Sequence, residues 1–340
     1  MYANVLECVP LETLAWEGWL GIYKHGDWRN TMRIVERRDM ISIIMLTYNR
    51  ETLVSRAIDS ILAQTYQDFE FIIVDNGSTD RSGQVADEYA ARDKRIKVKH
   101  RSRGSIGSGR NAGLDIVKGK YVAFIDDDDW VEPDFLEFLL KLAQDNDADM
   151  AICGATDKAF DEKKVMTPEE ALIELMWRKK YNAGFPTKLI HADLFYNLRF
   201  QEDESFDDIG LMYKLLAQAN KVAYHGLPKY HIYRHPGNHS SWTTDHRQIT
   251  PEILGEYLAV YRRRTEWLSN RFPDRAAAFQ YFEWSFMISM VEKIDRLHLQ
   301  CCEPIKADMA AELQKHRDDF LNAPEILDFE KDWVMQYIPA

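Results

Sequence analysis

Residues 40–50 read MISIIMLTYNR, an apolar run rich in isoleucine that stops at a polar turn. Residues 69–78, FEFIIVDNGS, repeat this pattern, and residues 53–62 between them place apolar side chains on one helical stripe. Buried strands that alternate with helices are typical of a mostly parallel, Rossmann-like α/β sheet with helices on both faces. Because ligands bind beyond the carboxyl ends of such strands, the polar residues after each strand are the first candidates for a site.

The alternation continues to about residue 150, where the sequence pattern changes. The expected elements are a helix that ends near Ala91, a strand at 96–99, a Gly/Ser loop at 104–109, a helix from Arg110, a strand at 121–125, a helix after Thr167, an irregular aromatic segment at 183–200, a helix at 209–219, strand-like pieces at 221–225 and 229–234, and two or three amphipathic helices within 251–321. The predicted fold class is therefore α/β with a helical C-terminal extension.

The composition excludes several classes of protein. Of 340 residues, 43 are Lys or Arg and 55 are Asp or Glu, and the formal net charge of −12 disfavours a nucleic-acid partner. No apolar run reaches the roughly 18 residues of a membrane-spanning helix, and the first 30 residues carry no basic start followed by an apolar stretch, so we do not expect secretion. The four cysteines match neither a disulfide framework nor a CxxC metal site. We expect a cytoplasmic protein, with contact to the inner face of the membrane left open.

The acidic surplus gathers in two stretches. Residues 126–137 hold seven acids and residues 202–208 hold five, and neither stretch contains Lys or Arg. The four consecutive carboxylates of Asp126–Asp129 repel one another unless a cation or a helix N-terminus lies nearby. Helix capping by Asp129 or Asp134 explains one of these acids but not four. Carboxylate oxygens at the end of a rigid strand suit Mg²⁺ or Mn²⁺ bridged to a diphosphate.

Four motifs follow one another along the chain: Thr47–Arg50, Asp75–Asp80, Gly104–Asn111 and Asp126–Asp129. They occur in the order and approximate spacing of family 2 glycosyltransferases with the GT-A fold. Each motif alone is weak, but their ordered occurrence is specific, and the chain resembles that family over about residues 40–240.

The resemblance implies roles for individual residues. Thr47 and Asp75 match positions that contact the nucleobase of a nucleotide-sugar, usually uracil. Residues 126–128 match the DXD motif, in which Asp126 or Asp127 faces the ribose and Asp128, with Asp126, binds Mn²⁺ or Mg²⁺. Guanidinium groups from Arg101, Arg103 and Arg110, which flank the Gly/Ser loop, suit phosphates. The predicted donor contacts are Thr47, Tyr48, Arg50, Asp75, Arg103, Arg110, Asn111, Asp126 and Asp127.

The second acidic stretch is the candidate for proton transfer. Displacement of a nucleoside diphosphate with inversion needs a carboxylate that takes the proton of the acceptor hydroxyl. The family places this base as the Asp of a Glu-Asp pair that opens a helix, and Asp207-Asp208 is the match here. We predict Asp208 as the base, with Asp207 and Glu204 as alternatives. Both acids of the pair would also suit a helix N-terminus without any catalytic role.

Two aromatic segments are less specific. Residues 230–242 resemble the family's tyrosine-rich strand and the His/Arg loop that closes over the diphosphate, but histidines of this kind are also common on surface loops. The candidates in this segment are His231, Arg234, His235, His239 and Trp242. Trp177, Tyr181 and Phe185 are candidates for an acceptor site or for core packing.

The resemblance implies an inverting, metal-dependent glycosyltransferase that moves a sugar from a nucleotide-sugar, with UDP as the expected nucleotide, to a hydroxyl of a glycan, lipid-linked or protein acceptor. Two alternatives remain: a sugar nucleotidyltransferase, or a non-catalytic nucleotide-sugar-binding assembly subunit. The predicted regions are 1–39, of unknown role, 40–150 for the nucleotide-sugar, 151–246 for the acceptor and the base, and a helical 247–340. The helical region offers a surface for a homodimer or for peripheral membrane contact. Its basic cluster Arg262–Arg264 is too small to favour the membrane over the dimer.

Overall fold

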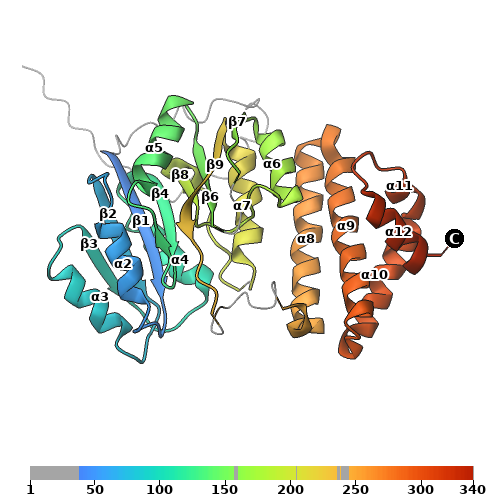
Figure 1. The fold of residues 1–340 in the computed structure, drawn as a ribbon, viewed down its shortest axis with the longest axis horizontal. Coiled ribbons are helices and arrows are strands. Elements are labelled where there is room, and N and C mark those ends of the chain that lie inside the picture. The colour runs from blue at the N-terminus through green and yellow to red at the C-terminus, as the bar shows by residue number, and fades with distance from the viewer. Residues whose placement is uncertain (1–37, 157–159, 204, 236–237, 239–244, 340) are drawn as a thin grey trace, which may run out of the picture. The chain divides into compact units, whose positions relative to one another are not determined.

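The computed structural model describes residues 38–339 apart from 157–159, 204, 236–237 and 239–244. The described strands form one mixed sheet in the order β3-β2-β1-β4-β8-β6-β9-β5, with β7 paired to β9 (Figure 1). The strands are β1 (Arg38–Thr47), β2 (Phe69–Asp75), β3 (Ile96–His100), β4 (Gly119–Asp126), β5 (Trp130–Val131), β6 (Met150–Ala155), β7 (Lys163–Met166), β8 (Lys188–His191) and β9 (Val222–His231).

Helices cover the sheet and form the C-terminal region. The α-helices are α2 (Val54–Leu62), α3 (Ser82–Ala90), α4 (Ile106–Leu114), α5 (Phe135–Asp145), α6 (Pro168–Trp177), α7 (Asp207–Gln218), α8 (Pro251–Arg271), α9 (Ala276–Arg296), α10 (Glu303–Lys315), α11 (Arg317–Leu321) and α12 (Asp328–Tyr337). Short 3₁₀ helices are η1 (Ala192–Phe195), η3 (His246–Gln248), η4 (Pro273–Arg275) and η5 (Gln300–Cys302).

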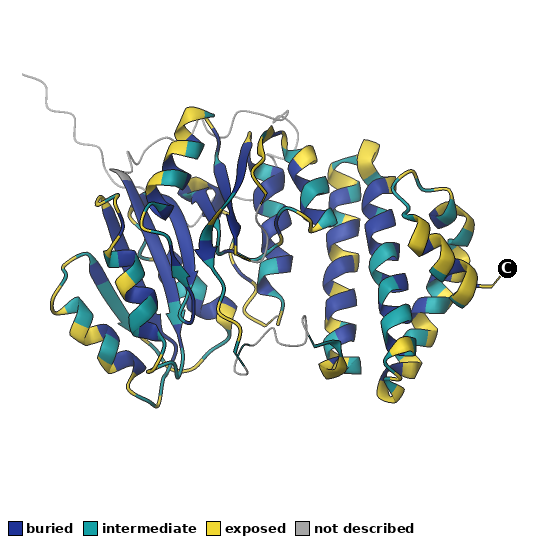
Figure 2. Ribbon diagram, viewed as in Figure 1, coloured by how far each residue is buried: buried dark blue, intermediate teal, exposed yellow. Residues whose placement is uncertain are grey.

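The central strands are buried on both faces, as Figure 2 shows. Along β1, Ile43 and Met45 pack with α2 and α5, whereas Ile44 packs on the opposite side with Leu114 of α4, as the two-residue period of a strand requires. The strands β1, β2, β3 and β4 pair in parallel, as predicted. In this register Thr47 lies opposite Asp75, and Leu46 lies opposite Asp126. The motifs that follow these strands therefore meet at one edge of the sheet.

One expected boundary is wrong. The helix expected from Arg110 begins at Ile106, so most of the expected Gly/Ser loop is helical. The side chain of Ser105 accepts a hydrogen bond from the Ser108 backbone and caps α4. A Cβ atom at Gly109 would lie 2.3 Å from Leu46 Cδ1. The glycines that indicate a loop in the sequence instead allow α4 to approach β1 closely.

The second half of the sheet also differs from the prediction. The expectation of an irregular segment at 183–200 misses β8, and β6 had no predicted counterpart. The strand β8 pairs antiparallel with both β4 and β6. It has four residues and begins with the fully buried Lys188, whose ammonium donates a 2.5 Å hydrogen bond to the Gly184 carbonyl. A short strand with a buried lysine gives no periodic signal. The two strand-like pieces at 221–234 form the single strand β9.

The C-terminal region is helical, as predicted, but residues 251–321 contain four α-helices, α8 to α11, rather than two or three. The helix α8 packs against α7, and α9 packs against α6, so these helices share one apolar core with one face of the sheet. None of the described helices combines the length and the apolar character that a membrane crossing requires. Cys153, Cys301 and Cys302 are free thiols.

Candidate active site

The acidic turn joins β4 to β5 and is fixed from several sides. The backbone amide of Asp129 donates to the Asp126 carbonyl at 3.2 Å and closes the turn. The buried carboxylate of Asp129 accepts hydrogen bonds from the Tyr230 hydroxyl at 2.7 Å and from the Tyr233 backbone at 2.8 Å. The same Tyr230 hydroxyl accepts from the Asp126 backbone at 3.1 Å. Asp129 thus ties the turn to β9 and the residues that follow it.

The next two acids point to different neighbours. Asp127 accepts from the Tyr48 backbone amide at 3.2 Å, and its other oxygen lies 3.8 Å from Nε of Arg50. Asp128 is buried, and its Oδ2 lies 2.9 Å from His235 Nε2 and 3.0 Å from the Asn238 side-chain amide. The predicted Thr47–Arg50 motif and the acidic turn therefore lie together with His235 and Asn238, two described residues of the predicted His/Arg segment.

The predicted nucleobase residues lie at the adjacent strand ends. Thr47 is fully buried, and Asp75 accepts from the Ser78 backbone at 2.9 Å. The second oxygen of Asp75 lies 3.0 Å from Nδ1 of His100, whose Nε2 lies 3.0 Å from Asp87. Hydrogen bonds to these two carboxylates raise the pKa of His100. Sequence reasoning missed His100. The signal available was its position at the end of β3, in register with Asp75.

The segment before α4 packs on the same edge. The guanidinium of Arg103 lies 3.8 Å from the centroid of the Tyr48 ring. Asn76 exchanges two hydrogen bonds with Gly104, at 2.8 and 3.2 Å. Gly77 has φ of +84°, and a Cβ there would lie 2.5 Å from the Arg103 backbone nitrogen. Within the described part of the chain, the buried Nη1 of Arg101 has no hydrogen-bond partner.

Arg110 connects the two acidic stretches. Its guanidinium lies 3.0 Å from the Asp207 carboxylate and 3.7 Å from the Asp126 carboxylate. Neighbouring Asn111 exchanges hydrogen bonds of 3.0 Å with the Phe200 backbone and donates to Glu202 at 3.1 Å. The middle of α4 therefore brings together two regions that are far apart in the sequence.

The two acids of the second stretch differ in their surroundings. Asp207 is buried and paired with Arg110, whereas Asp208 is only partly buried and accepts from the Ile209 backbone at 2.7 Å. Burial raises the pKa of Asp208, the adjacent Asp207 adds to the rise, and Arg110 opposes it. Both acids stand in the first turn of α7. Glu204 lies outside the described residues.

The less specific predictions have mixed outcomes. His231 stacks on Trp130 with centroids 5.0 Å apart and lies 2.5 Å from Glu132. Tyr181 and Phe185 are buried in the apolar core, so they pack rather than line an open site. Trp177 lies against the C-terminal helices. His239 and Trp242 lie outside the described residues. Asp134 forms no side-chain cap on α5 and is paired with Lys229 at 2.7 Å instead.

A divalent cation fits the chemistry of the acidic turn. Burial raises the pKa of Asp127 to about 7, and that of Asp129 to about 8, and neighbouring carboxylates add to both shifts. A cation would relieve this repulsion, and carboxylate oxygens are the ligands that Mg²⁺ and Mn²⁺ prefer. Over the described ranges, no three His, Cys, Asp or Glu side chains already form a metal cage. A bound cation would therefore need further oxygen ligands from the donor or from water.

This α/β sheet carries an acidic turn at its carboxyl edge and a second acidic pair beside it, the arrangement that the resemblance to family 2 glycosyltransferases predicts. The family model named Glycosyl transferase family 2 matches residues 42–205. Glycosyltransferase GlyG of Streptococcus pneumoniae is 32% identical over 206 residues, which cover 55% of this chain and 68% of GlyG. The chain belongs to glycosyl transferase family 2.

Other relatives agree with this placement. EpsH of Bacillus subtilis is 32% identical over 210 residues, which span 57% of this chain and 61% of EpsH. Among solved structures, Staphylococcus aureus TarS 1–349 in complex with UDP-GlcNAc superposes with a TM-score of 0.59 at 19% identity, over 88% of this chain and 81% of that one. At this identity the likeness shows the fold, including the helical region after the sheet.

Proposed function

We propose that this chain transfers a sugar from a UDP-sugar to a hydroxyl group of a glycan acceptor, with inversion at the anomeric carbon and with Mg²⁺ or Mn²⁺. One observation carries the proposal: Arg110 contacts Asp207 at 3.0 Å and Asp126 at 3.7 Å. The acidic turn and the acidic pair therefore flank one guanidinium. A transferase needs this proximity, because its base must reach the acceptor hydroxyl while the donor is held in place.

The strand ends support a role in donor binding. Thr47 and Asp75 lie side by side, and Arg103 and Tyr48 close the same edge. A buried N–H group without a hydrogen-bond partner is costly. Among the described residues Nη1 of Arg101 is such a group, and an oxygen of the bound UDP-sugar would stabilise it. The TarS complex makes UDP-GlcNAc the first donor to test.

The engaged oxygens limit the choice of metal ligands. In Asp129 both carboxylate oxygens accept hydrogen bonds, from Tyr230 and Tyr233, and in Asp127 they contact Tyr48 and Arg50. In Asp128 the contacts with His235 and Asn238 both fall on Oδ2, so Asp128 through Oδ1, with Asp126, would hold the cation. When bound, the cation would neutralise charge that develops on the leaving diphosphate.

The contrast between the two acids of α7 favours Asp208 as the base. The ion pair with Arg110 occupies one oxygen of Asp207. The raised pKa of Asp208 makes it a better proton acceptor, since a base works best when its pKa approaches the working pH. In the proposed step, Asp208 takes the acceptor's hydroxyl proton, the oxygen bonds to the anomeric carbon, and the bond to the diphosphate breaks with its electron pair leaving on UDP.

The test is the release of UDP from UDP-GlcNAc by the full chain, measured with Mn²⁺ and with EDTA. We expect Asp208→Asn to lower turnover by about 10²–10⁴-fold, with unchanged affinity for UDP. The matched control is Asp328→Asn, since Asp328 is an exposed first-turn acid of α12. Normal turnover in Asp208→Asn would disprove the assigned base, and full activity in EDTA would disprove the metal.

A further inference from the structure

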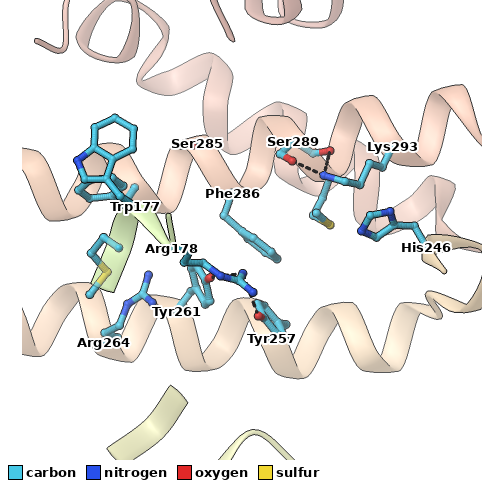
Figure 3. A pocket seen from close by; sticks show the side chains of 13 residues that line it. Trp177, Arg178, His246, Tyr257, Tyr261, Arg264, Ser285, Phe286, Ser289 and Lys293 are labelled. Carbon is cyan, nitrogen blue, oxygen red and sulfur yellow. Dashed lines mark hydrogen bonds between the residues drawn. The ribbon is translucent and has the colours of Figure 1, made fainter. Parts of the chain in front are cut away.

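A second candidate site lies between the end of α6 and the helices α8 and α9. It is a pocket of about 260 Å³, lined by Arg178, Tyr257, Arg264, Phe286 and Lys293 among others (Figure 3). Pockets for drug-sized ligands usually measure about 300–1,000 Å³, so this one suits a single sugar unit rather than a chain of them.

The lining is cationic and aromatic. Its described residues include two arginines, one lysine and His246, but no Asp or Glu. Aromatic rings and the Ser285 and Ser289 hydroxyls complete the wall. Aromatic faces pack against sugar rings, and hydroxyl groups bond to sugar hydroxyls, while clustered cations favour a negative group.

The cations are held in place. The guanidinium of Arg178 lies 3.4 Å from the hydroxyls of Tyr257 and Tyr261, as Figure 3 shows. Arg264 lies 3.8 Å from the Tyr261 ring, and it is 6% exposed. In the part of the chain that the structure describes, Nε of Arg264 has no hydrogen-bond partner. A buried guanidinium nitrogen without a partner is costly and would be satisfied by a ligand oxygen.

Repulsion among the positively charged groups of the pocket also favours a negatively charged ligand. Burial lowers the pKa of Lys293, and repulsion from Arg296 and Arg178 adds to this effect, although Glu292 opposes it. Burial and the nearby Lys293 also lower the pKa of His246. Behind the wall, Glu330 accepts from Ser285 at 2.5 Å and from Tyr281 at 2.7 Å, and Glu292 pairs with Arg296 at 2.5 Å. Buried Glu283 offsets part of the charge of Arg262 and Arg264. An anion in the pocket would relieve the repulsion.

The pocket adjoins the proposed base. The ring of Tyr257 packs edge-on against Phe206 with centroids 4.6 Å apart, and Phe206 directly precedes Asp207 and Asp208. A unit bound in the pocket would therefore lie next to the first turn of α7. This first turn carries the acid that would take the acceptor proton.

We propose that this pocket binds an anionic sugar unit of the acceptor, which carries a carboxylate or a phosphate. The inference rests on the proposed function, because it names the acceptor class for that reaction. The cations select the charged group, the aromatic rings hold the sugar, and the neighbouring unit is presented to Asp208.

The test compares four probes on the full chain by calorimetry: glucuronic acid, glucose 6-phosphate, glucose and inorganic phosphate. Wild type, Arg264→Gln, Lys293→Gln and the control Arg262→Gln are titrated. Arg262 is exposed on the same helix and does not line the pocket. Thermal unfolding checks that each variant folds, and the partly exposed Lys293 provides a second variant if Arg264→Gln is unstable. UDP affinity and UDP release are measured in parallel.

We expect one acidic sugar to bind about tenfold or more tightly than glucose, since a charge-assisted hydrogen bond is worth that factor. The two pocket variants should lose this preference, the control should keep it, and the bound probe should change UDP release. Whichever acidic sugar binds identifies the anion. Equal binding of glucose, binding of inorganic phosphate alone, unchanged binding in both variants, or binding without effect on UDP release would overturn the inference. A wild type that does not bind UDP would instead refute the proposed function, whatever the probes show.

Discussion

Replacement of Arg110 by Gln tests the connection between the two acidic stretches. The arginine side chain is 13% exposed and its partner Asp207 is 6% exposed, so the pair is shielded from water. Removal of one partner of a buried ion pair usually costs about 3–5 kcal/mol, because a charge is left without compensation. The matched control is Arg296→Gln. In this pair Glu292 is 12% exposed, but Arg296 itself is 55% exposed, so water screens the pair and it should contribute less, about 1 kcal/mol.

The cost in Arg110→Gln should depend on pH. Arg110 opposes the rise in the pKa of Asp208, so its loss raises that pKa further. A carboxyl group whose pKa is higher in the folded state binds more protons there, so stability falls as the pH rises above the unfolded value of about 3.9. The difference from wild type should therefore be largest near neutral pH and shrink as the pH falls toward 4.

The assay is urea denaturation at pH 7.5 and pH 4.5, combined with UDP release at pH 7.5. We expect a loss of about 3 kcal/mol at the higher pH, a smaller loss at the lower pH, and little or no turnover. A loss no larger than in Arg296→Gln, or a loss that grows on acidification, would refute the argument that Arg110 compensates these acids.

Three further changes have defined outcomes. His100→Gln should lower the free energy of unfolding by at most about 1 kcal/mol near pH 6. The difference from wild type should disappear as the pH rises through the raised pKa of His100, as urea titrations at several pH values would show. Gly77→Ala should weaken UDP binding in a calorimetric titration, because the +84° φ and the Arg103 backbone leave no room for a Cβ, and unchanged affinity would contradict this. Tyr230→Phe should cost about 1–3 kcal/mol in urea denaturation, since Asp129 and the Asp126 amide both lose a partner. A neutral effect would show that water replaces the hydroxyl.

The periodic parts of the chain were predictable. The strands β1, β2, β3 and β4 carry continuous apolar runs, and their polar ends indicated the edge where the site lies. The strand β8 was not predictable, because four residues that begin with a buried lysine form a strand only between β4 and β6. The start of α4 was misplaced because glycine occurs both in flexible loops and where a helix packs closely on a strand. The sequence alone does not distinguish these two roles.

The sequence by itself determined that the chain has an α/β sheet, with polar motifs after its strands and two acidic stretches. These features were readable because the periods of strands and helices, and the local charge, depend on neighbouring residues. Only the tertiary structure decided which acids meet. Arg110 reaches both Asp126 and Asp207, although the latter lies 97 positions further along the chain. The cationic pocket is likewise lined by residues from the end of α6 and from α8 and α9, which are distant in the sequence. Such contacts depend on how layers pack, and packing energy comes from residues that are distant in sequence.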